Sequence, residues 1–170
     1  TDKTGTLTFG KPKIISIETF GNINTKEFLK NVGIAESNSG HPIAKPIVEY
    51  VLAQKIVIPT VDNFNETPGE GIEVVSGKNR ILAGKTDFVI KKSEALTVEQ
   101  KNKLDGFIQT GHSITLIAIN KKICGFVIFE DAIRPQAKFM IAKTKSLGTK
   151  LWVMLTGDNP VVAKKVSDLV

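Results

Sequence analysis

The sequence predicts an α/β domain that is interrupted by an inserted α+β domain. In residues 130–170, helical patterns flank a continuous apolar run, and strand alternating with helix indicates a parallel α/β unit. From about residue 10 to residue 128 the pattern changes to two helices and several short strands between turn residues, which predicts a helical hairpin and an antiparallel sheet. We therefore expect residues 1–9 and 129–170 to form one discontinuous domain, and residues 10–128 to form the insertion.

The insertion is expected to begin with a strand and two helices. Residues 13–19 alternate apolar and polar side chains, as a half-buried strand does. Residues 22–34 place apolar side chains on one helical face, and Asn24 or Thr25 is suited to cap the first turn. Because proline is favoured in the first turn of a helix, we expect the second helix to start at Pro42.

Short strands and two further helices complete the expected elements of the insertion. Turns that contain glycine separate three strand-like runs, as in an antiparallel meander. Asn120-Lys121 joins two apolar runs and predicts a hairpin that completes the sheet. The expected strands are 61–67, 72–76, 80–83, 114–119 and 122–129, and the expected helices are 86–92 and 97–110.

The last part of the chain is expected to hold the α/β unit. Residues 134–147 and 159–170 have helical patterns, and residues 150–155 between them form the continuous apolar run. Such a run is typical of a strand that is buried on both faces.

Composition and charge argue against two classes of protein. The chain has 41% hydrophobic and 24% charged residues and no apolar run near the roughly 20 residues that span a bilayer, so we expect a soluble globular fragment. The net charge of +6 admits a nucleic-acid-binding protein, but the lysines are scattered and do not alternate with aromatic residues. We therefore expect a solvated basic surface and no nucleic-acid partner.

The first eight residues carry the strongest chemical signal. A carboxylate such as that of Asp2 is ionised at neutral pH and needs no base to act as a nucleophile. Its attack on a polyanionic phosphate requires cations and hydrogen-bond donors nearby. Lys3 is such a cation, Gly5 lets the backbone bend close to a phosphate, and Thr4 offers a hydroxyl and an N–H group. These residues indicate a phosphoryl-transfer loop.

The stretch Asp2-Lys3-Thr4-Gly5-Thr6-Leu7-Thr8 resembles the phosphorylation motif of P-type ATPases, the cation pumps that pass through an aspartyl-phosphate. This resemblance implies a haloacid-dehalogenase-like, Rossmann-type phosphorylation domain in which Asp2 takes the γ-phosphoryl group of ATP. It also implies that Mg²⁺ bridges the Asp2 carboxylate, the Thr4 backbone carbonyl and the phosphate.

A second motif, Thr156-Gly157-Asp158, follows the apolar run and precedes a helix. Open α/β sheets bind ligands at the carboxyl ends of strands, beside helix N-termini whose N–H groups favour anions. The tripeptide resembles the second P-type ATPase signature, which implies that the Thr156 hydroxyl and the Gly157 N–H contact phosphate and that Asp158 supports them. The stretch 131–135, Asp-Ala-Ile-Arg-Pro, resembles the family's hinge at the return to the phosphorylation domain.

Glu36 and the stretch Ser39-Gly40-His41-Pro42-Ile43 lie where the two predicted helices meet. A histidine just before a helix is at the positive end of the helix dipole, which favours a neutral ring that can stack on a base. The stretch resembles the Ser-x-His-Pro motif of heavy-metal-transporting P-type ATPases. The resemblance implies that Glu36 and His41 hold adenine, with Ser39 and Pro42 in the same site. Gly40 occupies a position where glutamate is common.

A glycine-rich loop is the last part of the expected nucleotide site. Gly69-Glu70-Gly71-Ile72 resembles the Gly-x-Gly loop of the same subfamily, in which missing side chains let the nucleotide lie against the backbone. Gly84-Lys85 stands where the family usually has Gly-Asn. Gly84 is therefore a candidate lining residue, and Lys85 is a departure from the family pattern.

Together these resemblances imply the ATP-binding region, with part of the phosphorylation domain, of a heavy-metal P-type ATPase, with copper favoured over zinc or cadmium. The implied cofactors are ATP and Mg²⁺, and the implied partners are the actuator and transmembrane domains of the same pump and the transported metal ion. The family's later Gly-Asp-Gly-x-Asn-Asp signature, which would supply the remaining Mg²⁺ ligand, does not occur before Val170. We therefore expect an incomplete, cytosolic portion of a membrane protein.

Two other functions share these motifs. A haloacid-dehalogenase-type phosphatase with a cap insertion usually carries a second aspartate two residues after the nucleophile, where this chain has Thr4. A threonine transfers protons poorly, which favours a long-lived phospho-enzyme over rapid hydrolysis. A non-catalytic nucleotide-binding module would use the motifs of the insertion and make no use of Asp2.

Overall fold

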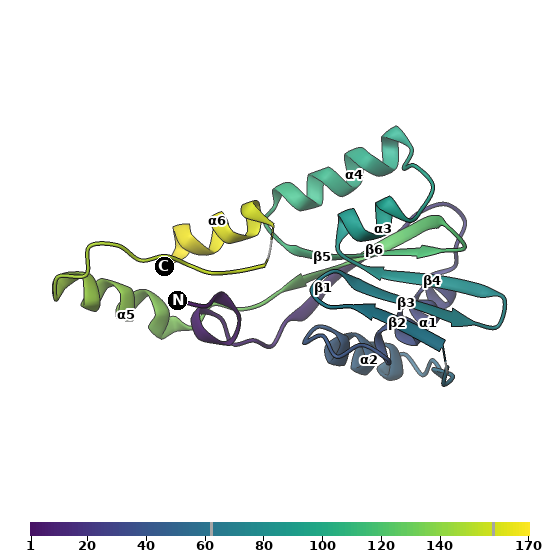
Figure 1. Cartoon of the computed structure of the whole chain (residues 1–170), viewed down its shortest axis with the longest axis horizontal. Helices are drawn as coiled ribbons and strands as arrows, with labels where there is room; N and C mark the ends of the chain where they lie inside the picture. Colours follow the sequence, from purple (N-terminus) through teal and green to yellow (C-terminus); the bar gives the residue numbers. More distant parts are fainter. Residues whose placement is uncertain (62, 158) are drawn as a thin grey trace.

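A six-stranded antiparallel sheet forms the middle of the insertion (Figure 1). The computed structural model describes residues 1–61, 63–157 and 159–170. The strand order is β1-β6-β5-β4-β3-β2, so β1 pairs with β6, and each strand from β2 to β5 pairs with the next one along the chain. The predicted meander and hairpin are confirmed. The strands are β1 (Lys13–Thr19), β2 (Asn63–Thr67), β3 (Gly71–Ser76), β4 (Asn79–Gly84), β5 (Ser113–Ile119) and β6 (Lys122–Glu130).

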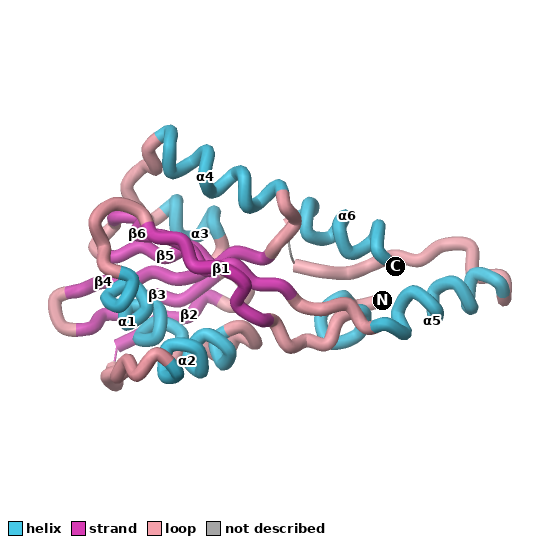
Figure 2. Tube along the Cα trace, turned by 180° about the vertical axis from the view of Figure 1, so that it is seen from behind, coloured by secondary structure: helices cyan, strands magenta, loops and turns pink. Residues whose placement is uncertain are grey.

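Two pairs of helices cover the two faces of this sheet (Figures 1 and 2). On one face Phe28 belongs to a large buried cluster, and on the other Phe126 packs edge-on against Phe20 and Phe107. The predicted helical hairpin and the two later helices are thereby confirmed. The helices of the insertion are α1 (Thr25–Glu36) and α2 (Ala44–Ala53) on the first face, and α3 (Thr86–Lys91) and α4 (Val98–Gln109) on the second.

Local sequence signals explain where several of these elements begin. The side chain of Asn24 accepts a hydrogen bond from the Lys26 N–H at 2.8 Å and caps α1, as predicted. Thr97 and Gln100 form a reciprocal capping box at the start of α4. In the β5–β6 turn, Asn120-Lys121 adopts positive φ angles of 50° and 70°, a conformation typical of tight hairpins.

The start of α2 differs from the prediction. We expected the helix to begin at Pro42, but it begins at Ala44. The Ile43 N–H donates to the His41 ring at Nδ1, 3.3 Å away, and the Ala44 N–H donates to the His41 carbonyl at 2.9 Å. These bonds hold residues 41–43 in a turn before the helix, which places the His41 ring at the helix entrance.

The terminal region, residues 1–12 and 131–170, lies beside the insertion and contains both ends of the chain (Figure 2). It comprises a wide turn, η1 (Lys3–Leu7), and the helices α5 (Pro135–Ser146) and α6 (Pro160–Leu169). Leu7 packs with residues of α5 and α6 in a small separate core. The fold is thus an α/β unit with an inserted α+β domain, which confirms the predicted fold class. Among the described helices, none combines the length and the apolar character needed to cross a membrane.

The prediction of a continuous strand at residues 150–155 is wrong. Within the described residues this segment makes a single parallel bridge, between Leu155 and Asp2. The Lys3 N–H donates to the Leu155 carbonyl at 3.2 Å, and the Leu155 N–H donates to the Thr1 carbonyl at 2.8 Å. An apolar pattern specifies an extended segment, but a strand also needs a partner along its length, and here Thr1 to Lys3 pair only with its end.

Candidate functional site

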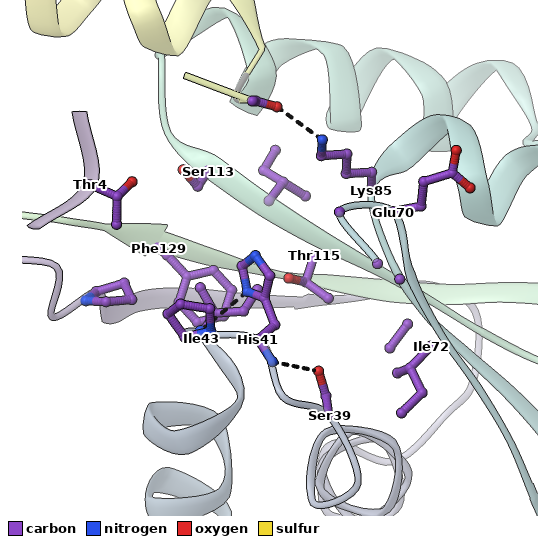
Figure 3. A pocket seen from close by; sticks show the side chains of 18 of the residues that line it. Thr4, Ser39, His41, Ile43, Glu70, Ile72, Lys85, Ser113, Thr115 and Phe129 are labelled. Atoms are coloured by element: carbon purple, nitrogen blue, oxygen red, sulfur yellow. Dashed lines mark hydrogen bonds between the residues drawn. The ribbon is translucent and has the colours of Figure 1, made fainter. Parts of the chain in front are cut away.

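One cavity of about 390 Å³ opens where the insertion meets the terminal region (Figure 3). This volume lies within the range of small-molecule sites, roughly 300–1,000 Å³. Thr4 lines it from the terminal region, whereas Ser39, Ile72 and Lys85 line it from three different parts of the insertion. The sheet and its helices therefore bring residues that are distant in sequence to one cavity.

The cavity gathers both groups of residues that the sequence singled out. Apart from Gly5 of the phosphoryl-transfer loop, every one of them that the structure describes lines it, and the predicted Asp158 lies outside the described part of the chain. The terminal region contributes Asp2, Lys3, Thr4, Thr156 and Gly157. The insertion contributes Glu36, Ser39, His41, Pro42, Gly69, Glu70, Gly71, Ile72 and Gly84.

The turn η1 presents Asp2 at the cavity. Asp2 is exposed, whereas Lys3 is 5% exposed. Gly5 has a φ of +81°, a conformation that glycine adopts without strain, and this residue lets the turn close with a hydrogen bond from the Thr8 N–H to the Lys3 carbonyl at 3.1 Å. The carboxylate is thus accessible to a ligand, while its neighbours fix the backbone that carries it.

Asp131 fixes the same turn. It lies where the chain returns from the insertion to the terminal region. Its carboxylate accepts hydrogen bonds from the Thr8 hydroxyl at 2.6 Å, the Gly10 N–H at 3.1 Å and the Lys11 N–H at 3.2 Å. Arg134 donates to the Thr8 carbonyl at 3.0 Å. The stretch predicted as a hinge is therefore bonded to residues 8–11, where the chain enters the insertion, and holds η1 in place.

Two carboxyl groups of the insertion meet at the cavity. Glu36 is 4% exposed, and burial together with the smaller effect of the Glu66 charge raises the pKa of Glu36 to about 7. The Glu66 carboxylate accepts hydrogen bonds from the Ser39 hydroxyl at 2.6 Å and from the Gly40 N–H at 3.2 Å. Glu66 thereby shapes the Ser-Gly-His-Pro turn, and a Glu36 carboxyl that is protonated near neutral pH is able to donate a hydrogen bond to a ligand.

The His41 ring is held in a defined orientation. Its Nδ1 accepts the hydrogen bond from the Ile43 N–H, so in the neutral ring the proton is on Nε2. The His41 N–H donates to the Ser39 hydroxyl at 3.1 Å (Figure 3). These contacts explain why a Ser-x-His-Pro spacing suits this place: serine fixes the backbone, and the ring faces the cavity.

Glycine suits the candidate positions for different structural reasons. Gly69 has a φ of +74° and open space around it, which leaves its backbone free to approach a ligand. A Cβ at Gly71 would lie 2.4 Å from the Ala83 carbonyl oxygen, and one at Gly84 would lie 2.5 Å from the Glu70 carbonyl oxygen. Close packing between β3 and β4 therefore requires Gly71 and Gly84, whatever ligand the cavity binds.

Several lining residues were not among the candidates. Lys85, which the sequence marked only as a departure from the family pattern, donates a hydrogen bond from Nζ to the Gly157 carbonyl at 2.9 Å across the cavity (Figure 3). Only the interruption of an apolar strand by a threonine could have pointed to Thr115. No local signal identifies Glu66, because its contacts with Ser39 and Gly40 are made only in the folded chain. The other unpredicted lining residues are Pro12, Ile43, Thr67, Ala83, Ser113, Ile114, Phe129 and Asp131.

The donor set at the turn is compatible with Mg²⁺ held together with a phosphate. Among the described residues there is no group of three or more His, Cys, Asp or Glu side chains that could hold a metal ion. Mg²⁺ usually binds through one or two carboxylates together with waters and substrate phosphates, and not in a cage made of protein side chains. The exposed Asp2 carboxylate and the neighbouring backbone of Thr4 fit such a site.

Comparisons with known proteins identify the family of the chain. The family model for haloacid dehalogenase-like hydrolases matches residues 1–170. A copper-exporting P-type ATPase of Staphylococcus haemolyticus is 33% identical over 167 residues, which cover 98% of this chain and 20% of that protein. A zinc/cadmium/lead-transporting P-type ATPase of Escherichia coli is 31% identical over 169 residues, which cover 98% of this chain and 22% of that protein. The chain thus spans about a fifth of the length of these curated relatives.

Solved structures show the same similarity. The catalytic domain of the CPx-ATPase CopB-B matches with a TM-score of 0.71 and 27% identity, over 99% of this chain and 55% of that chain. A zinc-transporting PIB-type ATPase in an E2·Pi state matches with a TM-score of 0.68 and 30% identity, over 99% of this chain and 27% of that chain. The chain belongs to the haloacid dehalogenase-like hydrolase family, and over nearly its whole length it is similar to the catalytic region of heavy-metal-transporting P-type ATPases.

Proposed function

We propose that the chain binds ATP in this cavity and that Asp2 receives the γ-phosphoryl group. The observation that carries the proposal is that a single cavity is lined both by the Asp2 turn and by the Ser-Gly-His-Pro and Gly-x-Gly stretches of the insertion. A nucleotide has an aromatic end and an anionic end, and we assign the first to the insertion and the second to the terminal region.

The nucleoside end is assigned to the insertion. Glu36 and His41 hold the base, the first by hydrogen bonding and the second by stacking. Ile72 lies in the β3 wall and is 1% exposed. Gly69 and Gly84 bring backbone close to the nucleotide. The remaining residues of this part of the proposed site are Ser39, Pro42, Glu70 and Gly71.

The phosphate end is assigned to the terminal region. One oxygen of the Asp2 carboxylate attacks the γ-phosphorus, the bond from that phosphorus to the bridging oxygen of ADP breaks, and an aspartyl-phosphate remains. Lys3, the Thr156 hydroxyl and the Gly157 N–H stabilise the phosphate charge, and Asp158 is assigned to support them. Asp2 and the Thr4 carbonyl would hold Mg²⁺, which supplies further neutralisation of phosphate charge when bound.

In the whole protein, formation and hydrolysis of the aspartyl-phosphate would drive export of a heavy metal by membrane helices, in concert with an actuator domain. Copper is favoured, because the first relatives that match are named copper-exporting pumps. This chain would then lie on the cytosolic side of the membrane.

The domain assignment is part of the same proposal. Residues 1–9 and 129–170 would form the phosphorylation domain and residues 10–128 the nucleotide-binding domain. The small core formed by Leu7, Ala137, Ile141 and Val166 is separate from the two clusters of the sheet, which supports this division. Strand β6 continues to Glu130, past residue 128 where the proposed insertion ends.

Calorimetric titration with ATP tests the nucleotide site. We expect binding in the original chain, a loss of about tenfold or more in affinity in both His41→Ala and Glu36→Ala, and little change in Asp2→Asn. Absence of ATP binding, or binding that is indifferent to His41 and Glu36, would contradict the assignment. Small phosphate esters then test the phosphatase alternative, since rapid Asp2-dependent hydrolysis of such esters would favour it.

A further inference from the structure

Thr115 is a buried polar residue that the cavity leaves unsatisfied. It lies in β5, lines the cavity and is 1% exposed. Within the described residues its hydroxyl has no hydrogen-bond partner. Leaving a buried hydroxyl without a partner destabilises the fold, so its presence on a strand whose other side chains are apolar, apart from Ser113 at the first position, calls for a reason.

The register of the sheet places this hydroxyl below the Ser-Gly-His-Pro turn. Thr115 pairs with Val127 of β6, and Val127 belongs to the cluster under α1 and α2. Partners in a sheet point to the same face, so Thr115 faces the helical hairpin that carries Glu36 and His41. In Figure 3 its oxygen points toward the part of the cavity where His41 and Phe129 lie.

The surroundings of Thr115 are apolar. Ile72, Ala83 and Phe129 line the same cavity and are each at most 1% exposed. Gly157 belongs to the phosphate end assigned above, and the Lys85 ammonium group lies beside it, 2.9 Å from the Gly157 carbonyl oxygen. Apolar side chains beside a hydrogen-bonding group suit a nucleobase, whose faces are apolar and whose edges are polar.

We propose that the Thr115 hydroxyl makes a hydrogen bond with a polar atom on the edge of the bound purine and thereby contributes to base recognition. A hydroxyl both donates and accepts, so it is able to pair with an amino group or a ring nitrogen. The inference rests on the proposed nucleotide site and assigns to it a contact from the sheet, in addition to those from the hairpin and the glycine loop.

The test replaces Thr115 by valine, which keeps the shape of the side chain and removes the hydroxyl. We expect Thr115→Val to weaken ATP and AMP binding by the same factor, roughly three- to tenfold, because the lost contact is at the base. Without nucleotide we expect its thermal midpoint to stay the same or rise, since the variant removes an unsatisfied polar group.

The chain offers a matched control in Ser93, the other buried hydroxyl that lacks a partner among the described residues and lies outside the described cavities. Ser93→Ala should leave both affinities unchanged. Unchanged affinity in Thr115→Val, or a loss seen with ATP and not with AMP, overturns the inference while the proposed function stands. If the original chain binds neither nucleotide, the proposed function fails first, and Thr115 loses its assignment with it.

Discussion

The insertion and the terminal region bury their apolar side chains to very different extents. In the insertion, clusters on both faces of the sheet contain large side chains that are fully buried, such as Phe28 and Phe126. In the terminal region, Leu7 and three residues from α5 and α6 make up one small cluster. Phe139 and Leu151 of that region are 69% and 76% exposed.

This difference in burial indicates that the two parts of the site are held rigid by different interactions. The nucleoside wall is built on a sheet that has a buried apolar cluster on each face. The Asp2 turn is fixed mainly by hydrogen bonds, those of Asp131 and Arg134 and the pairing with Leu155. Hydrogen bonds of this kind contribute about 1 kcal/mol each, less than the burial of one large apolar side chain. We infer that the turn opens more readily than the sheet.

The largest expected effect comes from a substitution in the core of the sheet. Phe126→Ala should lower the free energy of unfolding by about 3–5 kcal/mol, because it removes a fully buried ring that packs edge-on against Phe20 and Phe107. Urea denaturation measures the change.

Phe139→Ala is the matched control in the terminal region. Its ring is 69% exposed, and we expect a change within about 0.5 kcal/mol. If Phe139→Ala were as destabilising as Phe126→Ala, the contrast between the two regions would be wrong.

A smaller effect is expected from the buried carboxyl of the insertion. The pKa of Glu36 is raised by burial from 4.5 to about 7 in the folded chain. Between these values the unfolded chain loses the proton and the folded chain keeps it, so the free energy of unfolding falls as the pH rises from about 4.5 to about 7. Below this window Glu36 is protonated in both states, and above it the loss is complete, on the order of 3 kcal/mol.

Glu36→Gln sharpens this test. The variant should show a flatter dependence of stability on pH, with its greatest gain over the original chain above pH 7, measured by denaturation at a series of pH values. Glu49→Gln, at an exposed position of α2 beside Lys45, should keep the original profile. A profile in Glu36→Gln as steep as that of the original chain would show that another group is responsible.

Most elements of the fold could be predicted because their signals are local. The Asn24 cap, the Thr97–Gln100 capping box and the Asn120-Lys121 turn depend on residues a few positions apart, and the structure contains all three. The strand at 150–155 failed because strands depend on partners that an apolar pattern does not specify. The entrance of α2 differs because the ring and the carbonyl of His41 hold residues 41–43 in a turn before the helix.

The residues of the site also fall into those that local sequence signals predict and those that only the fold identifies. Its motifs could be found because phosphate chemistry and backbone approach require particular residue types in short stretches. Glu66 and Thr115 could not be found in that manner, since Glu66 acts on a turn 26 residues away and Thr115 matters through its place on the sheet. The sequence does not predict a role for Lys85, because it stands where the family pattern has asparagine, and only the folded chain shows that its side chain reaches Gly157.

The smallest expected effect concerns Lys85, whose side chain joins the two regions. Its ammonium group is 2.9 Å from the Gly157 carbonyl oxygen, so it lies where the phosphate chain of a nucleotide is assigned. Lys85→Met keeps the length of the side chain and removes the charge. We expect ATP affinity to fall roughly three- to tenfold and AMP affinity to change less than about twofold, because AMP lacks the outer phosphates.

Lys78→Met, at an exposed position in the β3–β4 turn, controls for the general loss of positive charge and should leave both affinities unchanged. Titration of the two variants with both nucleotides distinguishes a contact with phosphate from one with the base. Equal losses of affinity for ATP and AMP in Lys85→Met would show that Lys85 contacts the nucleoside and not the outer phosphates. A loss for ATP alone, beside equal losses in Thr115→Val, would fix the direction in which the nucleotide lies, with its base on the rigid sheet and its phosphates at the more easily opened turn.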